Sequence, residues 1–149
     1  MDYQTQISGI THVIQLAVAP VFLLTGVGTI IGVLANRLAR IVDRSRALKE
    51  QLEQLQGDRL RSARREVATL DRRMRIVYLA VALAVISALA VGLLIAVAFV
   101  DAFLAINLGK LIAVLFVAAM IAFIASLVAF LREIFLAVTT ARSAITADD

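Results

Sequence analysis

Residues 13–35 of the chain read VIQLAVAPVFLLTGVGTIIGVLA, a stretch without a single charged side chain. An α-helix rises about 1.5 Å per residue, so this stretch can cross the roughly 30 Å apolar core of a bilayer. Two further uncharged runs, residues 76–100 and 111–131, meet the same requirement. Together the three runs predict an all-α integral membrane protein with three transmembrane helices.

The composition of the whole chain agrees with this fold class. Of the 149 residues, 62% are hydrophobic and 17% are charged, whereas soluble domains are about half apolar and about a quarter charged. One domain of this length cannot bury so much apolar surface in its own interior. A water-soluble monomer is therefore excluded. The chain has no Cys, which also excludes a disulfide framework and a thiolate metal site.

The first apolar run does not have the features of a cleaved signal peptide. A signal peptide has a basic segment followed by an apolar run of about 7–15 residues. Residues 1–12 contain Asp2 but no Lys or Arg, and the run that follows is longer. We expect it to remain in the protein as the first span.

The basic residues predict the orientation of the spans. Twelve of the 15 Lys and Arg residues lie between positions 37 and 75, whereas residues 101–110 contain only Asp101 and Lys110 as charges. Lys and Arg concentrate on the cytoplasmic side of a membrane. We therefore expect residues 1–12 outside, and residues 36–75 and 132–149 in the cytoplasm, in a bacterial cytoplasmic membrane. The basic segment lacks interleaved aromatic residues, so nucleic acid is not an expected partner.

Residues 36–75 have a helical order of their own. Small and apolar side chains recur at alternating steps of three and four, which is the spacing of a coiled-coil seam. Gly57 and Asp58 are the only turn signal between the two halves. We predict an antiparallel coiled-coil hairpin whose first arm continues from the first span as one helix. Its seam positions are Leu38, Ile41, Ser45, Leu48, Leu52 and Leu55, paired with Val77, Met74, Leu70, Val67, Ala63 and Leu60.

This register brings like charges together on the flanks of the predicted hairpin. Arg44 lies near Arg73, and Lys49 lies near Arg64, which is mildly destabilising. These side chains either extend into water or are neutralised from outside the chain. The neutralising groups would be anionic lipid headgroups, a cytoplasmic protein partner or acids of a neighbouring subunit.

A line of polar and small residues distinguishes the first span from the others. Polar side chains in a span are costly and face another helix or a water-filled cavity. Both alternatives are open: the line forms hydrogen bonds between helices, or it lines a pathway. Three helices cannot enclose a pore, so a pathway needs several copies of the chain. The candidate pore-lining residues are Gln15, Phe22, Thr25, Thr29, Gly32 and Asn36.

The same hypothesis assigns the residues at the ends of the pathway. Arg37, Arg40 and Asp43 would lie at the cytoplasmic mouth, where a ring of positive charge favours anions. Phe22 is the bulky residue near mid-span and would be the hydrophobic gate.

Small residues recur every four positions along the second span. Such a ribbon lets another helix backbone approach closely in lipid, either within the chain or between copies. Its members are Ala80, Ala84, Ala88, Gly92 and Ala96.

The chain lacks a set of residues that could support catalysis. Its one histidine is His12, at the outer edge of the first span, and Glu133 stands beside Arg132 without other polar neighbours in the sequence. We expect no enzyme, no metal and no cofactor.

The run ISGITHVIQLAVAPVFLLTGVGTIIGVLANRLARIVDR, from Ile7 onward, resembles the opening of a bacterial family of small three-span membrane proteins. That family is filed as a domain of unknown function, number twenty-seven twenty-one. The resemblance extends over nearly the whole chain and is most distinctive at HVIQLAVAP and NRLARIVDR. It implies the three-span topology and brings no catalytic or binding residue.

Two functions follow from these patterns. The first is a homo-oligomeric ion channel or pore lined by the first span, which the polar line favours. The alternative is a non-conducting membrane scaffold whose cytoplasmic hairpin docks a partner protein, which the charged hairpin flanks favour.

Overall fold

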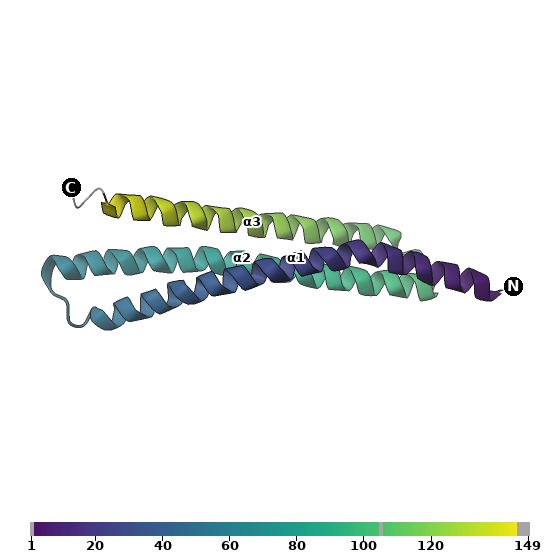
Figure 1. The fold of residues 1–149 in the computed structure, drawn as a ribbon, viewed down its shortest axis with the longest axis horizontal. Helices are drawn as coiled ribbons and strands as arrows, with labels where there is room; N and C mark the ends of the chain where they lie inside the picture. The colour runs from purple at the N-terminus through teal and green to yellow at the C-terminus, as the bar shows by residue number, and fades with distance from the viewer. Residues whose placement is uncertain (1, 105, 146–149) are drawn as a thin grey trace. The chain divides into compact units, whose positions relative to one another are not determined.

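The computed structural model of the protein consists of three helices, labelled in Figure 1: α1 (Asp2–Gln51), α2 (Gly57–Leu104) and α3 (Gly109–Ile145). It describes the backbone of residues 2–104 and 106–145. Side chains are described for residues 14–15, 18–104 and 106–138, so the side chain of His12 lies outside this part. The all-α fold class is confirmed.

Each helix contains a segment that is long and apolar enough to cross a membrane: Val18–Gln51, Gly57–Leu104 and Gly109–Val138. The prediction of three spans is therefore confirmed, and the protein is a multi-pass membrane protein. Helix α1 passes through Pro20 and continues to Gln51 without a break. Beyond Gly32, α1 contains neither Gly nor Pro, so no helix-breaking residue interrupts it before Gln51. The prediction that the helix of the first span continues past residue 35 without a break is therefore confirmed.

The two connections use backbone conformations that favour turns. Residues 52–56 join α1 to α2, and Gly57 has φ +63°, a value that glycine adopts without steric cost. Between α2 and α3, Asn107 also has φ 63°. The carboxylate of Asp101 accepts a hydrogen bond of 2.7 Å from the backbone N–H of Leu108, which holds this second turn beside the start of α3.

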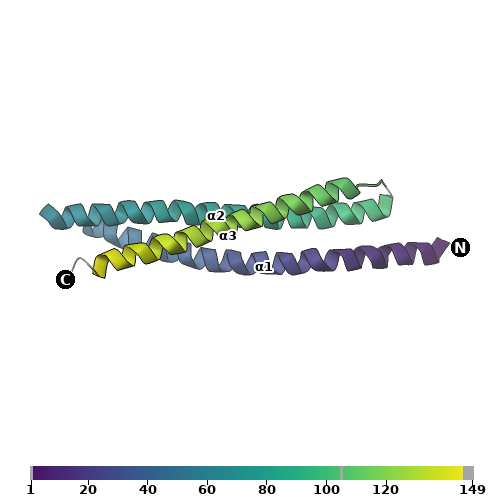
Figure 2. The same ribbon diagram turned by 90° about the horizontal axis from the view of Figure 1, so that it is seen from above.

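The chain forms two compact units, and each unit takes part of every helix. One contains Met1–Ile31 and Leu83–Ile124, and the other contains Gly32–Ala82 and Ala125–Asp149. Within each unit, consecutive helix segments run in opposite directions, as Figures 1 and 2 show.

The core of the first unit is built from small and branched apolar side chains. Val27 of α1, Val91 of α2 and Ala119 of α3 are fully buried. The hydroxyl of Ser87 donates a 2.9 Å hydrogen bond to the carbonyl of Ala119, so α2 and α3 are joined by a side chain–backbone bond. Small residues at this contact allow the two backbones to approach.

The core of the second unit follows a heptad on α1. Leu34, Ile41 and Leu48 are spaced seven apart and are buried, as a 3.5-residue repeat requires. In the same unit, the hydroxyl of Ser126 in α3 donates a 2.7 Å hydrogen bond to the carbonyl of Ala80 in α2.

Candidate functional site

A buried carboxylate joins all three helices within the second unit. The side chain of Glu133 on α3 is 1% exposed. Its Oε2 accepts a hydrogen bond from Arg37 of α1. Its Oε1 accepts two from Arg73 of α2, at 2.8 Å from Nη2 and 3.3 Å from Nε. We call these three side chains the boundary cluster, because each lies where an uncharged run ends or is about to begin.

The boundary cluster carries one negative and two positive charges. A buried carboxylate is tolerated because both of its oxygens are paired, whereas an unpaired one would be strongly unfavourable. Arg37 and Arg73 keep side-chain exposures of 36% and 21%, so the excess positive charge is partly hydrated. The guanidinium of Arg37 also lies 5.3 Å from the ring centre of Phe130, within the range of a cation–π contact.

The role of Glu133 was not predicted from the sequence. Its sequence neighbour Arg132 is exposed, and the partners of Glu133 come from α1 and α2 instead. A signal was present: Ala119, Ser126 and Glu133 are seven apart, and all three are fully buried. That spacing marks the inward face of α3, on which Glu133 is the only acid.

The candidate pore-lining residues lie on the outer face of α1. Gln15, Thr25, Thr29, Gly32 and Asn36 are exposed. Phe22, which completes this polar line, is 75% exposed.

The hydroxyls of the polar line are bonded within their own helix. Thr25 donates to the carbonyl of Val21 at 3.1 Å, and Thr29 donates to that of Thr25 at 3.0 Å. A Cβ added at Gly32 would meet no atom within 4 Å. These two hydroxyl groups are therefore satisfied within α1, and the candidate pore-lining residues are exposed.

The three residues assigned to the cytoplasmic mouth separate into two groups. Arg40 and Asp43 are exposed, as a mouth position requires. Arg37 is drawn to Glu133 in the boundary cluster, so its charge is paired inside the chain.

The small-residue ribbon of α2 turns from the inside to the outside of the chain. Ala80 and Ala84 are fully buried and Ala88 is half-buried, whereas Gly92 and Ala96 are exposed. A step of four residues advances about 400° around a helix, so each member is rotated about 40° from the one before. The five members of the ribbon therefore differ in burial and do not form one buried face.

The like-charge pairs expected on the hairpin flanks are also corrected. Arg44 binds Glu66 at 2.8 Å, and Lys49 approaches Asp71 at 3.4 Å. Arg73, the expected neighbour of Arg44, binds Glu133. The neutralising acids belong to the same chain, which neither alternative had foreseen.

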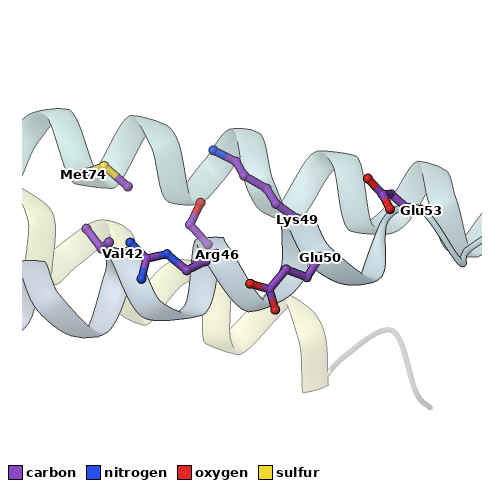
Figure 3. A pocket seen from close by; sticks show the side chains of 7 residues that line it. Val42, Arg46, Lys49, Glu50, Glu53 and Met74 are labelled. Carbon is purple, nitrogen blue, oxygen red and sulfur yellow. The ribbon is translucent and has the colours of Figure 1, made fainter.

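A hollow of about 430 Å³ lies between residues 42–53 and Met74 of α2. Figure 3 shows Arg46 and Glu50 lying apart along α1, with Lys49 directed toward α2, the helix that carries Met74. The hydroxyl of Ser45 lines this hollow, is buried and has no hydrogen-bond partner in the described part of the chain. Among those residues, no group of three His, Asp or Glu side chains could hold a metal ion.

These features define a class: an all-α, multi-pass membrane protein of three spans, whose helices are joined by a buried ionic cluster near one end of the uncharged runs. The chain belongs to the DUF2721 family of proteins of unknown function, whose model matches residues 17–143. The resemblance noted in the sequence is thereby confirmed. No curated protein and no solved structure matches the chain.

Proposed function

We propose that the protein is a homo-oligomeric pore of the bacterial cytoplasmic membrane, lined by the polar line of α1, and that it acts without a catalytic centre or cofactor. One observation carries this proposal: the polar line is exposed, whereas Val27 and Leu34 on the other side of α1 are buried. Exposed polar groups in a span are unfavourable in lipid. Further copies of the chain would cover them, and a shared axis would let water reach Gln15 and Asn36.

The structure changes the expected charge at the mouth of such a pore. With Arg37 paired to Glu133, the exposed charges that α1 supplies to the mouth are Arg40 and Asp43, which have opposite signs. Ion selectivity would then be weak while the boundary cluster is intact. Release of Arg37 from Glu133 would add positive charge and favour anions.

The hairpin part of the proposal rests on burial. All twelve predicted seam residues are buried or half-buried. The cross-strand ion pairs Arg44–Glu66 and Lys49–Asp71 flank that seam. These observations support a coiled-coil hairpin in the cytoplasm, with further exposed arginines close to anionic lipid headgroups.

Orientation is tested by cysteine labelling, because the chain has no Cys of its own. Gln56 and Ile106 are exposed residues of the two turns. In intact cells, Ile106→Cys should react with an impermeant thiol reagent added outside, and Gln56→Cys should react only after permeabilisation. The reverse pattern would overturn the proposed orientation.

Conduction is tested by ion flux through liposomes that contain the purified protein. Phe22→Ala should raise the flux, because it removes the bulky side chain from the proposed gate. Phe103→Ala on α2 is the matched control, since Phe103 is 73% exposed but lies off the polar line. Equal flux for both variants, or a monomeric protein in lipid, would contradict the pore.

The hollow beside Ser45 favours a second function, a scaffold whose hairpin binds a cytoplasmic protein. A buried hydroxyl without a partner costs about 1–3 kcal/mol, and a bound partner could satisfy it. An oligomeric protein that gives no flux, either as wild type or as Phe22→Ala, would favour this scaffold.

A further inference from the structure

A second charged site lies on the outer face of α3, at the level of the boundary cluster. A hollow of about 390 Å³ lies there, lined by five residues from successive turns of α3: Val128, Leu131, Arg132, Phe135 and Leu136. Four of the five are apolar, and Val128, Leu131 and Phe135 are 60%, 51% and 64% exposed. The hollow is thus an apolar surface open to the surroundings, with one guanidinium set in it.

Arg132 lies next to the boundary cluster in the sequence but is not part of it. Glu133 is its sequence neighbour, but both oxygens of that carboxylate are taken by Arg37 and Arg73. In the described part of the chain, Arg132 is exposed and forms no ion pair. The only acid nearby on α3 is therefore unavailable to it.

The surroundings of Arg132 favour the binding of an anion from outside the chain. The guanidinium is permanently charged, and it lies within the candidate span Gly109–Val138, with apolar residues on both sides. An unpaired charge in such a place is costly. The boundary cluster, with its excess positive charge, cannot compensate it. A negatively charged group with an apolar body would satisfy both parts of the hollow.

We infer that this hollow binds an anionic phospholipid. The phosphate would pair with Arg132, and an acyl chain would lie along Val128 and Leu131. A lipid of net negative charge is favoured over a zwitterionic one, because the latter brings its own cation close to Arg132. One cation near the membrane surface contributes about 1 kcal/mol toward anionic lipid, which corresponds to an enrichment of about fivefold. The inference is independent of whether the protein conducts.

The absence of Trp from the chain provides a local reporter. Leu131→Trp places one indole at the hollow, and Ile121→Trp places one at a 62% exposed position in the apolar part of α3. Each protein is reconstituted into mixed vesicles in which either the phosphatidylglycerol or the phosphatidylcholine carries bromine, which quenches Trp fluorescence. We expect the Trp at position 131 to be quenched preferentially by brominated phosphatidylglycerol, by about fivefold. The Trp at position 121 should show no preference.

Charge variants decide whether Arg132 is responsible. In the Leu131→Trp background, Arg132→Gln should abolish the preference. Lys110→Gln should leave it unchanged, because Lys110 is an exposed cation at the other end of the same helix. Equal quenching by both lipids at position 131, or a preference that survives Arg132→Gln, would overturn the inference. Native mass spectrometry of the chain without Trp checks the same point: wild type should retain phosphatidylglycerol, and Arg132→Gln should lose it.

Discussion

Two lines of polar and small residues run along the spans with the same spacing of seven. One line faces the interior of the chain, and the other faces its surroundings. On α3, Ala119, Ser126 and Glu133 are fully buried. On α1, the polar line that includes Phe22 and Thr29 is exposed. The spacing is equal, so it is the bonding partners that distinguish a line inside the chain from a line on its surface.

The hydroxyl groups show this difference most directly. Ser126 donates to the carbonyl of Ala80 on another helix, and Ser87 donates to Ala119 in the same manner. Thr25 and Thr29 donate to carbonyls of their own helix. A hydroxyl bonded to another helix stabilises their contact, whereas one bonded within its own helix leaves the surface free for other contacts.

The largest effect on stability is expected at Glu133, on the inward line. Glu133→Gln removes the only negative charge between Arg37 and Arg73, which then repel each other. Breaking a buried ion pair costs about 3–5 kcal/mol, and the partial exposure of both arginines places the expected loss near the lower end. Chemical unfolding in detergent micelles, followed by circular dichroism, measures it. Glu66→Gln is the control, because its pair with Arg44 is solvent-exposed and worth at most about 1 kcal/mol. Similar losses for the two variants would refute a special role of the boundary cluster.

Most of the fold could be predicted from the sequence, because the features that determine it are local. Uncharged runs predict spans, and uninterrupted helical sequence predicts that α1 continues past the membrane. The boundary cluster could not be predicted, since the pairing of Glu133 with Arg37 depends on which faces of α1 and α3 meet. The direction of the polar line was open for the same reason: periodicity identifies a face but not what that face contacts.

The ribbon of α2 tests how sharply the inward and outward faces are divided. Ala84→Leu adds three carbons at a fully buried position, and such overpacking costs about 1–3 kcal/mol. Ala96→Leu adds the same atoms at an exposed position and should leave the unfolding free energy of the chain nearly unchanged. The same unfolding assay applies. A loss of oligomer in Ala96→Leu with an intact fold would show that the exposed end of the ribbon contacts another copy.

Ser126 gives a smaller and more specific test of the inward line. Ser126→Ala removes the hydrogen bond to Ala80 without adding volume, and such bonds between membrane helices average about 0.6 kcal/mol. The loss should therefore be measurable but well below that of Glu133→Gln. If Ser126→Ala were neutral in the unfolding assay, small size rather than hydrogen bonding would explain the residue at this position.

The smallest effect on the fold is expected at Thr29, on the outward line. Thr29→Val keeps the shape of the side chain and removes a hydroxyl that is bonded only within α1, so unfolding should change by less than about 0.5 kcal/mol. Flux should respond differently, because an apolar ring next to Phe22 would make the proposed pathway drier and lower conduction. Val33→Thr is a useful counterpart, since Val33 is 42% exposed on the same helix and the change adds a hydroxyl instead of removing one. Lower flux with Thr29→Val and an unchanged fold would place Thr29 on the water-facing side of α1. A loss of stability as large as that of Ser126→Ala would mean that Thr29 packs against a neighbour as an inward residue does, and the contrast between the two lines would disappear.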